Sequence, residues 1–215
     1  MEELTLPHII PITTGTDTFL LLCPLNTEVL HMDLSELPSE LINRIESFKS
    51  DSRKAEVITT HFLLEKATGS KHIVHYDAFN KPYLKGNPLS LSISHSSHYA
   101  AVFLSVTSCG VDVETISSRA SKIAHKFVHD SERLLISGYT ENQADTIIWS
   151  VKEAVYKISG QPDFKSSILI RSDIRPDKEM LHVDIINRNN TQKIKVFYRI
   201  FEDQVIAWTH EDISI

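Results

Sequence analysis

The sequence has few of the residues that mark several large classes of protein. It contains only two cysteines, Cys23 and Cys109, and no CxxC spacing, which argues against a disulfide framework and against a cysteine-rich zinc site. We therefore expect two buried, reduced thiols in a cytoplasmic protein. No apolar run approaches the length of a membrane span. Glu2 and Glu3 stand where a signal peptide would be basic, so we expect no signal peptide.

Positive charge is also scarce. The chain has 22 Lys and Arg residues against 28 Asp and Glu residues, which gives a net charge of −6 at pH 7. This balance argues against general nucleic-acid binding, although a local basic pocket for a phosphorylated ligand is compatible with it. A hydrophobic content of 41% and a charged content of 23% are ordinary for a soluble globular protein. The 215 residues suffice for one large domain or two small ones.

The clearest element in the sequence is a helix over residues 142–160. Neither Pro nor Gly interrupts it, and Gly160 stands where a C-terminal cap belongs. Apolar residues recur with helical spacing on one side, whereas Trp149, Glu153 and Lys157 recur every four residues on a different side. By itself this second side also fits a solvent-exposed Glu–Lys pair, which contributes only a few tenths of a kcal/mol.

A second acidic group lies upstream, in residues 110–114 (GVDVE). The alternation predicts a strand in which Asp112 and Glu114 lie on the same side, about 6–7 Å apart, with the two valines on the other side. Such a strand also fits an ordinary half-buried sheet, but two adjacent like charges repel unless a cation or solvent lies between them. Adding Glu153 gives three carboxylates, a ligand set that suits Mg²⁺ or Mn²⁺ better than zinc.

The remaining patterns predict a mixture of helices and antiparallel strands. Short strands joined by turns are expected within residues 1–32, including the apolar runs at 4–10 and 29–32. A helix is predicted over residues 51–68, with Ser50 or Asp51 as its N-cap and Gly69 as its end. Arg53 lies in its first turn, where free backbone N–H groups favour a phosphate.

Several further strands and two short helices complete the prediction. Residues 89–94, 99–106 and 109–114 are expected to form an antiparallel meander. The helices are expected over residues 117–128 and 130–137. The strands that follow the long helix are expected at residues 166–171, 181–186, 193–201 and 205–209.

Four segments together resemble one known family. Residues 110–114 (GVDVE) and 149–157 (WSVKEAVYK) are similar to the two-part signature of 4'-phosphopantetheinyl transferases. Residues 80–83 (NKPY) and 92–96 (SISHS) resemble further segments of that family, in the same order. Asn80 stands where the family usually has glycine, and asparagine also tolerates the left-handed turn geometry.

The chain length resembles that of the surfactin-synthetase-activating type, which carries two similar halves in one chain. This resemblance implies two α+β halves in a pseudo-dimeric arrangement, with antiparallel sheets and a long helix in each half. The expected domains are residues 1–108, with contacts to coenzyme A phosphates, and residues 109–215, with the metal carboxylates and the catalytic helix. Because both halves are in one chain, we expect a monomer.

The resemblance also implies the site and the reaction. Coenzyme A is expected to bind in the cleft between the two halves, with its phosphates contacted by Arg53, Lys81, Ser94, His95 and Lys157. Mg²⁺, or Mn²⁺ in its place, is expected on Asp112, Glu114 and Glu153. A serine hydroxyl of a carrier protein would attack the β-phosphorus, and 3',5'-ADP would leave. Glu153 and Lys157 are the expected catalytic residues; the base is either Glu153 or a metal-bound water.

The expected partners are coenzyme A and an apo acyl, peptidyl or polyketide carrier protein, which would place the enzyme in fatty acid or polyketide biosynthesis. No nucleic acid or membrane partner is expected. Lys152 is interpreted as structural or ion-paired, and Trp149 as a packing residue. Two other functions fit the same carboxylates: a metal-dependent phosphodiesterase or nuclease, and a non-catalytic module that binds coenzyme A or a carrier protein.

Overall fold

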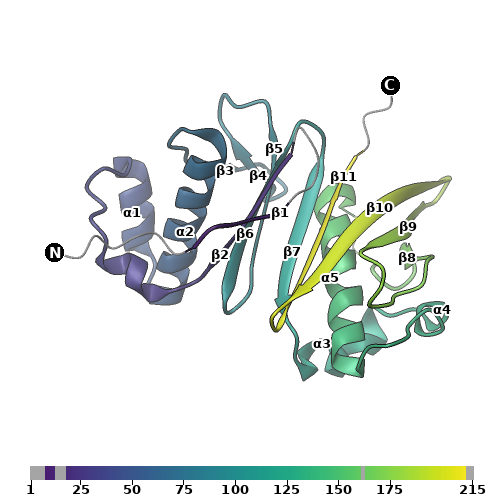
Figure 1. The fold of residues 1–215 in the computed structure, drawn as a ribbon. Helices are drawn as coiled ribbons and strands as arrows, with labels where there is room; N and C mark the ends of the chain where they lie inside the picture. The colour runs from purple at the N-terminus through teal and green to yellow at the C-terminus, as the bar shows by residue number, and fades with distance from the viewer. Residues whose placement is uncertain (1–7, 13–17, 161–162, 212–215) are drawn as a thin grey trace. The chain divides into compact units, whose positions relative to one another are not determined.

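The computed structural model describes residues 8–12, 18–160 and 163–211 (Figure 1). The chain divides into two compact units, Met1–Val106 and Thr107–Ile215. Each unit combines helices with antiparallel strands, which confirms the predicted α+β class. The pseudo-dimeric relation between the halves, and the roles assigned to residues 1–108 and 109–215, stay predictions.

The first unit contains a four-stranded antiparallel sheet with strand order β1-β2-β6-β5. Helix α2 packs against β2 and β6, and its Leu63 and Leu64 contribute to the buried core. The sheet consists of β1 (Ile10–Ile12), β2 (Thr18–Pro24), β5 (Ser90–His95) and β6 (Tyr99–Ser105). The other elements are α1 (Ser39–Ser47), α2 (Asp51–Thr68) and a hairpin of β3 (Val74–Tyr76) and β4 (Pro82–Leu84).

Helix α2 has the predicted bounds because its ends are encoded locally. The Ser50 side chain accepts a hydrogen bond from the Arg53 backbone N–H, and Gly69 ends the helix in left-handed geometry with φ 71°. The prediction of a strand at residues 29–32 is wrong. Thr27–His31 forms a 3-10 helix, η1, because the Asn26 side chain accepts a hydrogen bond from Glu28 N–H and caps it. Residues 4–7 of the predicted run at 4–10 lie outside the described residues.

The predicted meander is correct for two strands and wrong for the third. β5 pairs with β6, but the other neighbour of β6 is β2, which comes from much earlier in the chain. The third predicted strand, β7 (Cys109–Thr115), pairs instead with β11 in the second unit. Because β2 satisfies the second edge of β6, the short connection to β7 does not lead to pairing.

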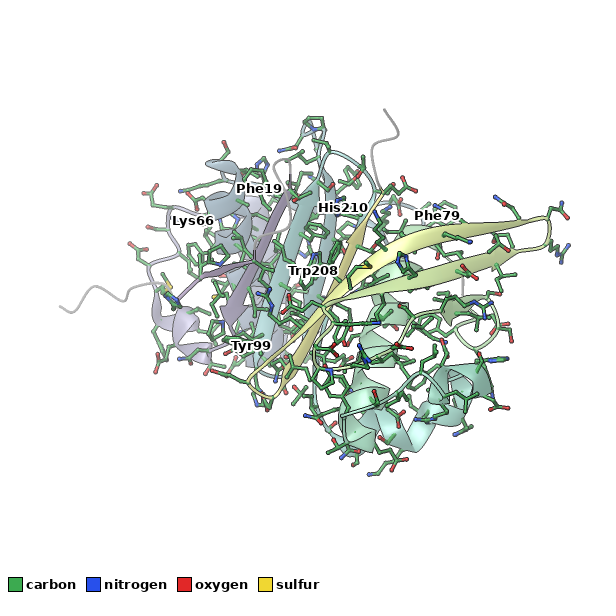
Figure 2. All side chains as sticks on the ribbon, turned by 45° about the vertical axis from the view of Figure 1, so that its right-hand side comes forward. Phe19, Lys66, Phe79, Tyr99, Trp208 and His210 are labelled. Atoms are coloured by element: carbon green, nitrogen blue, oxygen red, sulfur yellow. The ribbon has the colours of Figure 1, made fainter. Side chains whose placement is uncertain are left out.

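The second unit is a five-stranded antiparallel sheet with a long helix along one face (Figure 1). The strand order is β7-β11-β10-β9-β8. Trp208 and His210, labelled in Figure 2, come from β11. The strands other than β7 are β8 (Ile168–Ile170), β9 (Met180–Asn187), β10 (Asn190–Phe201) and β11 (Gln204–His210).

Helix α5 (Glu141–Ser159) is the helix that covers this sheet. It begins with a capping box between Thr140 and Gln143 and ends at Gly160, which is left-handed with φ 66°. Its apolar side, including Val151 and Val155, is buried against the sheet. The two short helices expected before α5 are shorter than predicted: α3 (Ser118–Ile123), a 3-10 turn (Ala124–Lys126) and α4 (Asp130–Arg133).

Lys152 of α5 is fully buried and ion-paired. Its Nζ donates to Glu132 Oε2 at 2.8 Å and to the carbonyl oxygens of Phe127 and Phe164 at 2.7 Å each. The Glu132 carboxylate also accepts the backbone N–H groups of His129 and Ile170. Burial lowers the pKa of Lys152, and the Glu132 charge opposes that shift. These bonds therefore link α5 to the segment before it, which holds Phe127 and Glu132, and to the segment after it, which holds Phe164.

Gly110 allows β7 and α5 to approach closely. A Cβ atom at this position would lie 2.0 Å from the Ala154 carbonyl oxygen, far inside van der Waals contact. Because Ala154 adjoins Glu153 and Gly110 lies two residues before Asp112, this contact also sets the separation of the acidic residues on the two elements. None of the helices in the described ranges has the length and apolar character needed to span a bilayer.

We expect Gly110→Ala to destabilise the protein by about 3 kcal/mol, because the new methyl group would push β7 away from backbone atoms of α5. Urea unfolding measures this free energy. Gly69→Ala is the control: its Cβ would meet no atom within 4 Å, so only the left-handed geometry is penalised, by about 1 kcal/mol. Equal losses in the two variants would show that the contact with Ala154 does not limit packing.

Lys152→Met is expected to lower the free energy of unfolding by about 3–5 kcal/mol, because it leaves the Glu132 carboxylate buried without its counter-charge. Lys193→Met, at an exposed position of β10, is the matched control and should change stability by less than about 0.5 kcal/mol. A Lys152→Met protein as stable as this control would contradict the role of the buried pair.

Candidate functional site

Two acidic side chains of β7 lie on the face of the sheet that α5 covers. Lys157 Nζ of α5 donates to Asp112 Oδ1 at 3.0 Å, and Trp149 Nε1 of α5 donates to Glu114 Oε1 at 3.2 Å. Asp112 is 5% exposed, whereas Glu114 is half-buried. The predicted alternation of β7 is therefore confirmed, and it brings both carboxylates against the helix that carries Glu153.

Glu153 completes an acidic cluster with these two residues. Burial, followed by the charge of Asp112, raises the pKa of Glu153 to about 7, and the charge of Glu114 adds to the shift. Burial and the charge of Asp112 also raise the pKa of Glu114. These mutual effects require the three carboxylates to be close together, as the sequence predicted.

Lys157 is the cation in contact with this cluster. Its Nζ donates to the Val111 carbonyl oxygen at 2.6 Å and to Asp112 Oδ1 at 3.0 Å. Its positive charge lowers the pKa values of both Glu114 and Glu153 and so favours their ionised forms. Lys157 lies four residues after Glu153, one helical turn further along the same side of α5.

The cluster has donors suited to Mg²⁺, but it is not arranged around an ion. Within the described ranges, no group of three or more His, Cys, Asp or Glu side chains is arranged to hold a metal. The three carboxylates nevertheless supply the oxygen ligands that Mg²⁺ prefers. Burial and the charge of Asp112 raise the pKa values of Glu114 and Glu153, Lys157 opposes that shift, and a divalent cation would oppose it further. The residues present are therefore chemically compatible with Mg²⁺ or Mn²⁺.

Trp149 packs as expected and also makes a contact that the sequence did not reveal. Its ring lies edge-on to Phe127, with centroids 5.1 Å apart, and against Phe164 at 5.6 Å. Its hydrogen bond to Glu114 joins α5 to β7. No sequence signal identifies this bond, because the two residues are 35 positions apart and their pairing depends on how α5 crosses β7.

A second polar cluster lies in the first unit. Arg53 of α2 and His95 at the end of β5 approach to 3.2 Å between Nη1 and Nε2, and both contact the Glu56 carboxylate. The Arg53 guanidinium also lies over the Phe48 ring, 5.6 Å from its centroid. The structure thus brings together two residues that the resemblance selected. Glu56 was missed, although its position three residues after Arg53 on a helix was an available signal.

Two further residues were predicted to contact phosphate, Ser94 and Lys81. Ser94 precedes His95 on β5 and is 8% exposed. Lys81 precedes β4, where its backbone N–H donates to Asp77. Among the described residues, its ammonium makes no hydrogen bond or ion pair with Arg53, Glu56 or His95. Asn80 has φ 60°, which confirms the left-handed turn expected there.

Comparison with known proteins relates the segment that holds the acidic cluster to one family. Residues 108–209 match the family model described as the 4'-phosphopantetheinyl transferase superfamily. A 4'-phosphopantetheinyl transferase of Aneurinibacillus migulanus, gsp, is 25% identical over 122 residues, which cover 55% of this chain and 49% of that protein. The chain thus spans about half the length of this curated relative. Residues 108–209, which match the 4'-phosphopantetheinyl transferase superfamily, hold all four side chains of the cluster: Asp112, Glu114, Glu153 and Lys157.

Proposed function

We propose that this protein transfers the 4'-phosphopantetheine arm of coenzyme A to a serine of an apo carrier protein and releases 3',5'-ADP. The observation that carries the proposal is the cluster of Asp112, Glu114, Glu153 and Lys157, within the residues that match the family. Such a cluster offers the two things that attack on a pyrophosphate needs: neutralisation of charge and a proton acceptor. The proposed carriers are acyl, peptidyl or polyketide carrier proteins.

Mg²⁺, replaceable by Mn²⁺, is the proposed cofactor, and Asp112, Glu114 and Glu153 are the side chains that would hold it. A bound divalent cation would neutralise charge on the pyrophosphate oxygens. The proposal is supported by the chemistry of the donors and by the raised pKa values of Glu114 and Glu153, which burial and then the charge of Asp112 cause.

The chain's own residues would do the remaining chemistry. The serine oxygen forms a bond to the β-phosphorus as the bond from that phosphorus to the oxygen of 3',5'-ADP breaks. We propose that Glu153, a carboxylate of the cluster beside Asp112 and Lys157, accepts the serine proton. The Lys157 ammonium, held near Asp112, would offset charge that develops on the 5'-phosphate of the leaving 3',5'-ADP.

Arg53 and His95 are proposed contacts for a phosphate of coenzyme A, with Lys81 and Ser94 as further contacts. Support comes from the first turn of α2, where Arg53 lies beside helix N–H groups, and from the approach of His95 to its guanidinium. The Glu56 carboxylate is the anion that these two side chains contact now. An incoming phosphate would take the place of that carboxylate.

The activity is tested by mixing the protein with coenzyme A, Mg²⁺ and several apo carrier proteins, and weighing the carriers by mass spectrometry. We expect a metal-dependent gain of one phosphopantetheine arm. Asp112→Ala and Glu153→Gln should each lower the rate at least about 100-fold, because charge neutralisation or the proton acceptor is lost. Glu141→Gln, at an exposed position of the same helix, should react like the wild type.

Three other results would contradict the transferase proposal. Binding of coenzyme A without modification of any carrier would favour a non-catalytic module. Release of free phosphopantetheine without transfer would favour a phosphodiesterase. If Glu153→Gln and Glu141→Gln reacted equally fast, Glu153 would have no part in the reaction.

The raised pKa of Glu153 predicts a particular pH dependence of stability in metal-free protein. The folded pKa of about 7 lies above the model value of 4.5, so its protonation favours the folded state. That contribution is complete below about pH 4.5 and is lost as the pH rises through 7. Glu153→Gln should therefore be more stable than the wild type at pH 8 by about 1–3 kcal/mol, after allowance for solvent screening, and equally stable near pH 4.5.

Urea unfolding with a chelator present measures this difference, and Glu141→Gln is again the control. Saturating Mg²⁺ should stabilise the wild type at pH 8 more than it stabilises Glu153→Gln. In the wild type the bound ion compensates the charge of the Glu153 carboxylate, and the variant lacks that carboxylate. A difference between wild type and Glu153→Gln that does not vary with pH would contradict the raised pKa.

A further inference from the structure

The indole of Trp149 is bonded to one of the proposed metal carboxylates. Its Nε1 donates to Glu114 Oε1 at 3.2 Å across the junction between α5 and β7. The indole N–H can only donate, so this contact requires an acceptor, which the Glu114 carboxylate oxygen provides. Trp149 lies on α5 one helical turn before Glu153. Its bond to Glu114 therefore connects α5 to β7 beside the acidic cluster.

The Trp149 ring itself packs against two aromatic side chains. The two rings it contacts belong to Phe127 and Phe164. The backbone carbonyl oxygens of these same two residues both accept hydrogen bonds from the buried Lys152 ammonium. Lys152 therefore anchors the two residues that form the aromatic cradle, and the cradle in turn limits how far the indole can move.

Glu114 needs such a restraint, because the charges around it would drive it away. Asp112 lies on the same side of β7, and Glu153 lies on the facing helix. A glutamate side chain has three rotatable bonds, so it can turn toward solvent and away from like charges unless a specific contact holds it. Within the described ranges, Arg119 is the other cation whose charge acts on Glu114 besides Lys157.

We propose that Trp149 is a positioning residue, whose N–H holds the Glu114 carboxylate in place for a divalent cation. This inference rests on the proposed function, in which Glu114 is a metal ligand. Trp149 takes no part in bond making or proton transfer. Its hydrogen bond restricts the Glu114 side chain before the ion binds. Less conformational entropy is then lost on binding, and the affinity for the metal is higher.

Trp149→Phe is the direct test, since it keeps an aromatic ring in the cradle and removes only the donor. With Mn²⁺ as the probe, measured by electron paramagnetic resonance of the free ion, we expect the dissociation constant to rise about 10-fold. In the carrier assay the Mg²⁺ concentration for half-maximal rate should rise similarly, while the rate at saturating Mg²⁺ stays near that of the wild type. Trp208→Phe, at the other tryptophan of the chain, is the matched control and should bind Mn²⁺ like the wild type.

A double-mutant comparison separates positioning from general packing. Once Glu114→Gln has removed the carboxylate, adding Trp149→Phe should weaken Mn²⁺ binding no further, because the two residues act through one ligand. Equal and independent losses from the two substitutions would overturn the inference. Circular dichroism and urea unfolding of each variant show whether it is folded before its affinity is interpreted.

A second measurement keeps Trp149 intact. In Trp208→Phe protein Trp149 is the sole fluorophore of its kind, and Mg²⁺ should shift its emission in a saturable way. The shift should disappear in Trp208→Phe/Glu114→Gln protein. Wild-type protein that binds neither Mn²⁺ nor Mg²⁺ would refute the proposed metal site itself. Wild-type binding with unchanged affinity in Trp149→Phe would refute only the positioning role.

Discussion

The close contact between the backbones of β7 and α5 is the constraint on which the acidic cluster depends. At Gly110 the missing side chain leaves room for the Ala154 carbonyl oxygen, and a methyl group there would lie 2.0 Å from it. Asp112 and Glu114 follow at alternate positions of the strand, and Glu153 adjoins Ala154 on the helix. A strand and a helix held apart by ordinary side chains would place these carboxylates on opposite sides of a packed apolar layer. The contact at Gly110 therefore sets how closely the carboxylates of β7 and α5 can approach each other.

Gathering three carboxylates in a half-buried place is unfavourable, and the surrounding residues show how the protein tolerates it. Lys157 supplies a positive charge at Asp112, and Trp149 supplies a hydrogen bond to Glu114. Burial, together with the charge of Asp112, still raises the pKa values of Glu114 and Glu153. Shifted pKa values of this kind are common where binding or catalysis requires them. The buried Lys152–Glu132 pair, whose groups are all hydrogen-bonded, connects α5 to the segments before and after it.

The two units carry different kinds of support for the proposed transferase. In the second unit, the family match and the acidic cluster concern the same residues, so both support the proposal independently. The first unit lies outside the matched residues 108–209, and its Arg53–Glu56–His95 cluster is supported by contacts alone. A guanidinium and an imidazole that share one carboxylate form a group in which an anion is already accommodated. That property suits a phosphate, and it was visible only after α2 and β5 had been placed together.

Local sequence signals determined the helix α5 with its Gly160 cap, the helix α2 between Ser50 and Gly69, and the side of β7 on which Asp112 and Glu114 lie. These features follow from capping and from side-chain periodicity, which involve residues only a few positions apart. Tertiary structure alone decided that β7 pairs with β11 and not with β6, that Trp149 bonds to Glu114, and that Glu56 joins Arg53 to His95. Strand pairing and these side-chain contacts join residues tens of positions apart, and many partners satisfy the same local pattern. Only the packing of the complete chain selects among them.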